Sequence, residues 1–185
     1  PNPSPAAQPT EQSRMFSITE QTATLAHINV RTERHGDEPA GAADLKINFT
    51  DGNGVLSEFH PVLRSFLYKQ EESPDQGEIP VGDALTVRRF GDLIEKIRLK
   101  HELIGALVVI GFGLGDSSDI DLDPADVDGF AAELMEGGSV VITFRVKCHP
   151  SGEQIKKLYE VLGNDITISI TPAIEKQATL GLTLE

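Results

Sequence analysis

The chain has 185 residues, of which 29 are Asp or Glu and 16 are Lys or Arg, so its formal net charge is −13. This length fits one ordinary domain with a substantial core, and the excess of acid argues against a broad basic face for duplex nucleic acid. Apolar residues make up 39% of the chain, yet no apolar run is long enough to span a bilayer, so we expect no membrane segment. A single cysteine, Cys148, excludes an internal disulfide framework and a Cys-rich zinc site.

The first residues differ in composition from the rest. Residues 1–14 hold four prolines among Ala, Gln, Ser and Thr and have almost nothing apolar to bury. We expect them to form an extended arm, either native or added ahead of a natural start at Met15. Residues 15–185 are expected to form a single globular domain.

Period-two alternation predicts the first two strands. Apolar and polar side chains alternate over residues 24–31 and again over 44–50, which is typical of half-buried strands. The charged residues 33–41 between them predict a loop, and the Asp-Gly-Asn-Gly sequence at 51–54 predicts a turn.

The middle of the chain changes period. Apolar residues take helical spacing, and Pro61 suits a first helical turn, so we expect a helix near residues 61–68. Residues 70–80 predict an exposed loop. The stretch 84–110 fits either strands or a helix, and we favour strands because residues 108–110 are β-branched and glycines bracket them.

The second half contains the clearest signals. Residues 130–134 and 140–146 face each other across Glu-Gly-Gly, which predicts a β-hairpin. Residues 151–162 predict a helix with a capping box between Ser151 and Gln154, and alternation over 166–170 predicts a last strand. We therefore expect a mainly β (α+β) fold, an antiparallel sandwich or barrel of about seven or eight strands.

The densest charge is a run of acids between residues 116 and 136 that contains no Lys or Arg. Asp119, Asp121 and Asp123 have the spacing of a calcium loop, but Pro124 and Phe130 stand where an EF-hand needs Gly and Glu, so calcium is an alternative and not our prediction. A solvated acidic edge is the simplest interpretation. The functional interpretation of the acidic run is a carboxylate surface that docks on a basic protein partner. The predicted contact residues are Asp116, Asp119, Asp121, Asp123, Asp126 and Asp128.

Basic residues gather in two other places and suggest an alternative function. One group spans residues 88–100 and the other residues 145–157, with the aromatic residues Phe90, Phe144 and Tyr159 nearby. Cations combined with stacking rings can form a groove for single-stranded nucleic acid. The residues predicted to bind it are Arg88, Arg89, Arg98 and Lys100.

No residue pattern predicts a catalytic centre or a cofactor. His35 lies beside carboxylates and Arg34, but a charged hairpin loop is the simpler interpretation. Cys148 and His149 are adjacent strand residues and so point to opposite faces, with Cys148 in the apolar register. Residues 111–115 are glycine-rich, but the acids that follow would repel phosphate, so we predict neither a nucleotide loop nor an enzyme.

Four segments resemble a group of uncharacterised proteins from tailed bacteriophages and prophages. They are residues 29–38, 43–46, 113–115 and 144–150. The resemblance implies expression in the cytoplasm of a bacterial host, near small genes of DNA metabolism or anti-defence, and it assigns no catalytic residue. Together with the acidic run, it leads to the hypothesis of a non-enzymatic phage accessory protein that binds a macromolecular partner.

Overall fold

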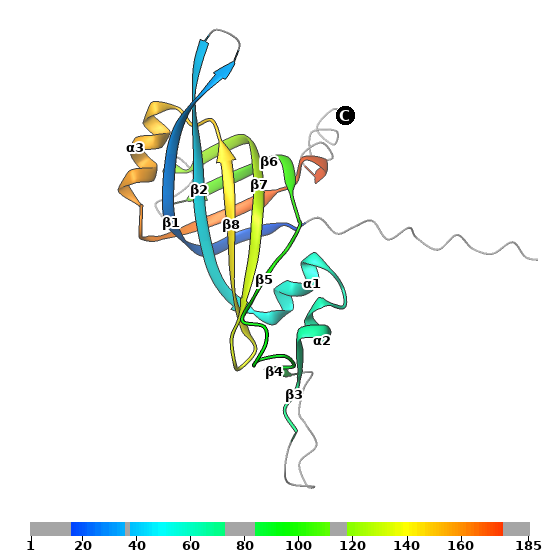
Figure 1. The fold of residues 1–185 in the computed structure, drawn as a ribbon. Helices are drawn as coiled ribbons and strands as arrows, with labels where there is room; N and C mark the ends of the chain where they lie inside the picture. The colour runs from blue at the N-terminus through cyan, green and yellow to red at the C-terminus, as the bar shows by residue number, and fades with distance from the viewer. Residues whose placement is uncertain (1–15, 36–37, 73–83, 112–117, 176–185) are drawn as a thin grey trace, which may run out of the picture.

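The computed structural model describes residues 16–35, 38–72, 84–111 and 118–175. Six antiparallel strands close into a ring in the order β7-β6-β9-β1-β2-β8, and β8 pairs back to β7 (Figure 1). The sequence predicted either a sandwich or a barrel, and the closed ring is a barrel. Its strands are β1 (Ile18–His35), β2 (Glu38–Gly52), β6 (Leu103–Gly111), β7 (Ile120–Leu134), β8 (Ser139–Cys148) and β9 (Asp165–Thr171).

Apolar side chains fill the inside of the ring because every strand alternates between inward and outward positions. On β8 the inward residues are Val140, Ile142, Phe144, Val146 and Cys148, all buried. Phe130 of β7 is at the centre of an aromatic cluster, with ring centroids 5.0 Å from Phe16 and 5.6 Å from Phe144. Each such side chain contributes about 1.5–3 kcal/mol to folding by leaving water.

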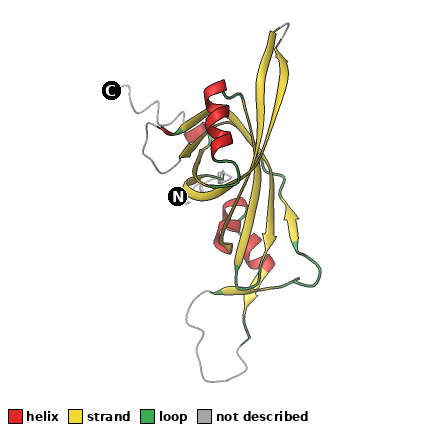
Figure 2. Ribbon diagram, turned by 90° about the vertical axis from the view of Figure 1, so that its left-hand side faces the viewer, coloured by secondary structure: helices red, strands yellow, loops and turns green. Residues whose placement is uncertain are grey.

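A two-stranded arm projects from the ring (Figures 1 and 2), and here the prediction of a loop over residues 33–41 was wrong. The pairing of β1 with β2 continues to His35 opposite Glu38, whereas β8 stops pairing with β2 at Ala43. Beyond that point the two strands pair only with each other among the described residues. Backbone pairing with one neighbour does not require an apolar side chain at every second position, so a charged sequence is compatible with such strands.

A small lobe covers the opposite end of the ring. It consists of η1 (Asn53–Val55), α1 (Leu56–Phe59), α2 (Leu63–Leu67) and the hairpin of β3 (Tyr68–Gln70) with β4 (Leu85–Arg88). The helix expected near 61–68 corresponds to α2, which ends at Leu67 because Tyr68 enters β3. After the lobe, β5 (Lys96–Arg98) pairs with the lobe-side half of β7.

Two buried polar side chains fix the lobe: Tyr68 attaches it to the β7–β8 turn of the ring, and Asn53 joins elements of the lobe to one another. The Tyr68 hydroxyl donates to the carbonyl oxygens of Met135 and Ser139, 3.1 and 3.0 Å away, and burial raises the pKa of this phenol. The Asn53 amide donates to the Leu85 carbonyl at 2.6 Å and accepts a hydrogen bond from Arg64 at 2.8 Å. Buried polar groups need such partners, so these bonds fix where the lobe sits.

The predicted elements of the second half are present. Leu134 pairs with Val140 across the expected hairpin, and β9 covers the expected last strand. α3 (Gly152–Glu160) begins with the expected capping box, in which Ser151 and Gln154 exchange two hydrogen bonds of 3.2 and 2.8 Å. The helix ends earlier than expected, since residues 161–164 form a turn with Gly163 at φ +80°. Within the described residues, no helix has the length and apolar character needed to cross a bilayer.

Candidate functional site

Strand β7 presents its acids on the outside of the ring. Inward positions such as Ile120 and Leu122 are buried, and the Asp residues occupy the outward positions between them. Of the predicted contact residues, Asp116 lies outside the described residues. The others are Asp119, directly before β7, and Asp121, Asp123, Asp126 and Asp128 within it.

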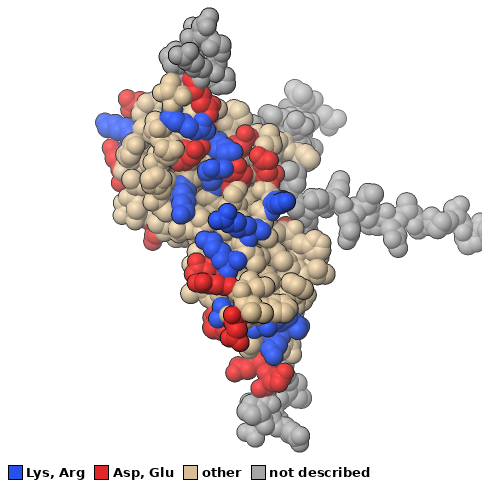
Figure 3. Space-filling view, in the orientation of Figure 1, with Lys and Arg blue, Asp and Glu red and all other residues tan. Residues whose placement is uncertain are grey.

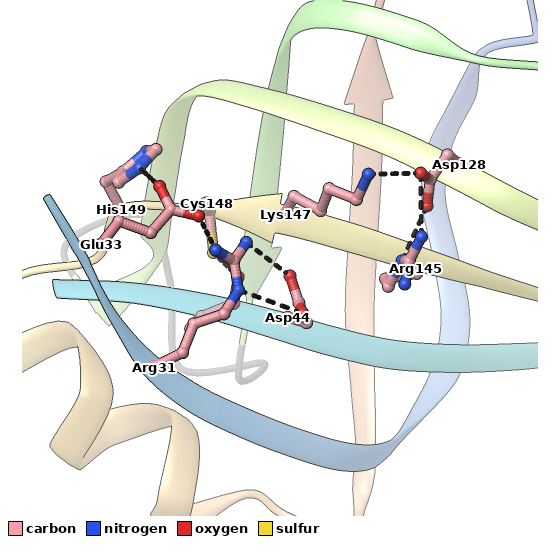
Figure 4. A network of polar contacts seen from close by, with 9 residues as sticks. Arg31, Glu33, Asp44, Asp128, Arg145, Lys147, Cys148 and His149 are labelled. Atoms are coloured by element: carbon pink, nitrogen blue, oxygen red, sulfur yellow. Dashed lines mark hydrogen bonds and ion pairs between the residues drawn. The ribbon is translucent and has the colours of Figure 1, made fainter. Parts of the chain in front are cut away.

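Asp128 is neutralised by the neighbouring strand (Figure 4). Its two carboxylate oxygens accept hydrogen bonds from Arg145, at 2.8 and 3.0 Å, and Lys147 approaches to 2.6 Å. The hydrogen bond from Arg145, followed by that from Lys147, holds the pKa of the Asp128 carboxyl below its ordinary value. The charge of the Asp128 carboxylate is therefore compensated by Arg145 and Lys147 of β8, so it contributes little to binding a basic partner.

Asp126 is committed to the backbone of β6. Its Oδ1 atom accepts a hydrogen bond of 2.9 Å from the Gly105 amide, at a point where the β6–β7 register shifts. Gly105 has φ +69°, a conformation that glycine adopts at such bulges without strain. The Asp126 carboxylate satisfies the backbone donor that the bulge exposes. Asp126 and Asp128 together are the paired middle of β7.

The acidic start of β7, defined as Asp119, Asp121 and Asp123, has a different environment. The last β7 residue paired with β8 is Asp126, opposite Lys147, and β8 ends one residue later. Residues 120–125 therefore extend past β8 and pair, among the described strands, only with β6, where Asp121 faces Val109. The β8 cations consequently have no register position opposite these acids.

Local contacts hold the acidic start in place. Gln154 of α3 donates from Nε2 to the Asp121 carbonyl at 2.9 Å while its Oε1 caps the helix. The Asp119 carboxylate packs on Gly111, where an added Cβ would come within 3.1 Å of Oδ1. The side chains of Asp121 and Asp123 are exposed. The result is a backbone held in place that presents the Asp121 and Asp123 side chains to solvent.

The calcium alternative gains no geometric support. Among the residues that the structure describes, no three His, Cys, Asp or Glu side chains converge on a point where a metal ion would fit. Strand geometry explains why, since the alternate Asp residues are spread along an extended chain and are not folded around a centre.

The residues of the nucleic-acid alternative are divided between two places. Arg88 forms an ion pair with Glu136 at 2.7 Å, and Arg89 donates to the Ser65 carbonyl at 2.8 Å, so both belong to the lobe. Arg98 on β5 and Lys100 just after it are exposed. Of the proposed stacking rings, Phe144 is 1% exposed inside the ring and has no free face, whereas Phe90 and Tyr159 are 37% and 50% exposed.

The outer wall of the ring carries a second polar network that the sequence did not reveal (Figure 4). Arg31 bonds Asp44 with two hydrogen bonds of 3.3 and 3.1 Å and also pairs with Glu33. Glu33 in turn contacts His149 Nε2 at 3.1 Å. These residues come from β1, β2 and the end of β8, so only the cross-strand register brings them together.

A shallow groove of about 500 Å³ crosses the same wall. Its lining includes His27, Asn29, Lys46, Thr143 and Arg145. Lys46 is exposed and forms no ion pair with any residue that the structure describes. Figure 3 shows Lys and Arg side chains in an oblique band over this face, with acidic side chains beside them.

Cys148 is not placed for catalysis. It is 1% exposed inside the ring, and burial raises its thiol pKa to about 12, so the thiol stays protonated at neutral pH. His149 is exposed on the opposite face, which confirms the expectation that the two side chains diverge.

Comparison of the chain with protein-family models, with curated proteins and with solved structures finds no match.

Proposed function

We propose that this chain is a non-enzymatic accessory protein that binds a basic surface of a protein partner through the acidic start of β7. The same molecule has two kinds of surface acid. The carboxylates of the paired middle bind groups of their own chain, whereas Asp121 faces an aliphatic neighbour and solvent. The exposed Asp121 carboxylate can exchange solvent for a partner's cations without breaking a side-chain contact to any residue that the structure describes.

The observation that carries this proposal is the extension of β7 beyond β8. Because β8 ends at Cys148, Asp121 has no register position opposite Arg145 or Lys147, while the Gln154 hydrogen bond and the contact of Asp119 with Gly111 hold the chain around it. A rigid set of charges loses little conformational entropy on binding. Carboxylates in such a set steer a basic partner and contribute specificity.

The setting of a phage protein that acts in DNA metabolism or anti-defence within the bacterial cytoplasm is supported by the sequence resemblance. In that setting, a carboxylate array suits partners with nucleic-acid-binding surfaces, because those surfaces are basic. We propose this class of partner.

Affinity capture from a bacterial lysate tests the proposal. We expect the wild-type chain to recover a defined basic protein, and the double variant Asp121→Asn with Asp123→Asn to recover at least tenfold less. Glu133→Gln is the matched control, since Glu133 is exposed on the same strand opposite Lys96 of β5. Equal recovery by the double variant and the control would sink the proposal.

A second candidate function is single-stranded nucleic-acid binding, which the groove on the wall favours. Lys46 has no described carboxylate partner, and Arg145 lines the same groove. Backbone phosphates could cross the wall between these cations and Arg98 on β5.

Fluorescence anisotropy with a labelled oligothymidine distinguishes this candidate from the first. Real phosphate binding weakens steeply between low and moderate salt and is reduced by Lys46→Ala, because fewer counterions are released. Lys156→Ala, on α3 away from the groove lining, is the control. An absence of binding at low salt would eliminate this candidate and leave the first intact.

A further inference from the structure

Four large apolar side chains are exposed at α2 and in the turn that follows β4, two segments that Figure 1 shows at the lobe end of the ring. Val62 and Phe66, at α2, are 57% and 58% exposed, and Phe90 and Leu93, in the turn after β4, are 37% and 85% exposed. The Phe66 and Phe90 rings lie 5.5 Å apart between centroids. These four side chains form what we name the end patch. Clustered apolar exposure of this kind marks an interaction surface.

The end patch is held rigidly. The Arg89 amide donates to the Leu67 carbonyl at 2.8 Å, which joins the turn to α2, and the Ile94 amide donates to the Phe90 carbonyl at 2.7 Å. Beneath the patch, Tyr68 is fully buried and bonded to the β7–β8 turn. The two rings are therefore exposed in a fixed position, and little entropy is lost when a partner covers them.

A positive charge lies beside the rings. The Arg89 guanidinium donates from Nε to the carbonyl oxygens of Ser65 and Tyr68, at 2.8 and 3.2 Å. Among the described residues Arg89 forms no ion pair with a carboxylate. Its side chain is thus oriented by neutral acceptors while no carboxylate in the described part of the chain compensates its charge, and a carboxylate is the group that complements it best.

We propose that the end patch and Arg89 form a docking site for a short peptide segment of another protein, one that combines aromatic or aliphatic anchors with a carboxylate. The anchors would cover the two rings and Leu93, and the carboxylate would bind Arg89. This site is separate from the acidic start, because Tyr68 ties the lobe to the far end of β7. The end patch with Arg89 prefers a negatively charged partner, whereas the acidic start prefers a positively charged one.

The surroundings favour a peptide over the two other occupants. Asp92 and Glu95 are exposed in the same turn and would repel the repeated phosphates of a nucleic acid more strongly than the single carboxylate of a short peptide. A second copy of the chain would bring another net charge of −13. Such like-charged surfaces oppose association.

Selection of a displayed random-peptide library on the purified protein tests the occupant. We expect the enriched peptides to combine Phe, Leu or Ile with Asp or Glu. A labelled synthetic copy of an enriched peptide should then bind about tenfold more weakly to Arg89→Gln, which loses a charge-assisted contact. Leu93→Ser should weaken binding similarly without affecting folding, because Leu93 is 85% exposed. Ile104→Ser is the matched control, since Ile104 is a 60% exposed apolar residue on β6 and should leave binding unchanged.

Several results would overturn the proposal. Enrichment of basic peptides, no enrichment at all, or equal affinity of wild type and Arg89→Gln each contradict it. A dimer in sedimentation that Leu93→Ser dissociates would assign the patch to a second copy. Binding of labelled oligothymidine that Phe66→Ser abolishes would assign it to nucleic acid. Each of these readouts is independent of the acidic start, so the proposed function and this inference fail separately.

Discussion

The acidic start and the paired middle of β7 contain the same residue type on the same face of one strand, yet their carboxylates have different surroundings. Asp128 accepts hydrogen bonds from Arg145 and Lys147, and Asp126 satisfies the Gly105 amide. Asp121, beyond the end of β8, faces Val109. The comparison teaches that the position of a neighbouring strand's end decides which acids of a dense run lie opposite that strand's cations and which extend beyond them.

Substitution of Asp128 should give the largest effect on stability. Asp128→Ala removes the partner of two cations from a site where the carboxylate side chain is 16% exposed, so we expect the free energy of unfolding to fall by about 1–2 kcal/mol. Urea unfolding measures this loss. A loss no larger than that of the exposed Glu133→Ala would show that the paired middle is not paired in solution.

The Asp128 contribution should depend on pH. The folded-state pKa of this carboxyl lies below its ordinary value of 3.8, so its stabilisation is present above that pH and is lost as the pH falls through the folded pKa. The difference in unfolding free energy between wild type and Asp128→Asn should therefore be full at neutral pH and shrink below pH 3.8. A difference that stays constant down to the acid transition contradicts this assignment.

Asp126→Ala should have a smaller effect. It leaves the Gly105 amide without its carboxylate acceptor at a half-buried position, which costs about 1 kcal/mol in unfolding free energy. Asp126→Asn keeps an oxygen acceptor and should recover most of the loss. If both variants are equally destabilised, the carboxylate charge matters more than the hydrogen bond, and our account of the bulge is wrong.

Asp121→Ala should have the smallest effect on stability, within about 0.5 kcal/mol of wild type, because an exposed side chain with no side-chain partner among the described residues adds little to folding. Thermal unfolding of the wild type and this variant checks the expectation. A loss as large as that of Asp128→Ala would mean that the acidic start is structural as well, and the contrast within β7 would disappear.

Local sequence patterns predicted those parts of the fold that local forces determine. The Ser151–Gln154 capping box marked the start of α3, and alternation around Glu136-Gly137-Gly138 marked the β7–β8 hairpin. The burial of Cys148 followed from the same alternation. Such signals need only neighbours in the chain.

Features that depend on register between distant strands were beyond sequence reasoning. The sequence predicts a loop over residues 33–41 because its charged residues show no apolar alternation, although β1 and β2 stay paired to His35 and Glu38. The network of Arg31, Glu33 and His149 needs the register of three strands. The division of the acidic run likewise needs the end point of β8, a non-local property that the spacing of Asp residues does not encode.

The most direct test of the central claim is the dissociation constant of the captured partner, measured by calorimetry at low and moderate salt. We predict that Asp121→Asn with Asp123→Asn weakens binding at least tenfold at low salt and flattens its salt dependence. Asp128→Ala should leave the affinity unchanged at temperatures where it is folded. Equal affinity of the double variant and wild type, or a larger loss in Asp128→Ala, would contradict the claim that the acidic start is the binding surface.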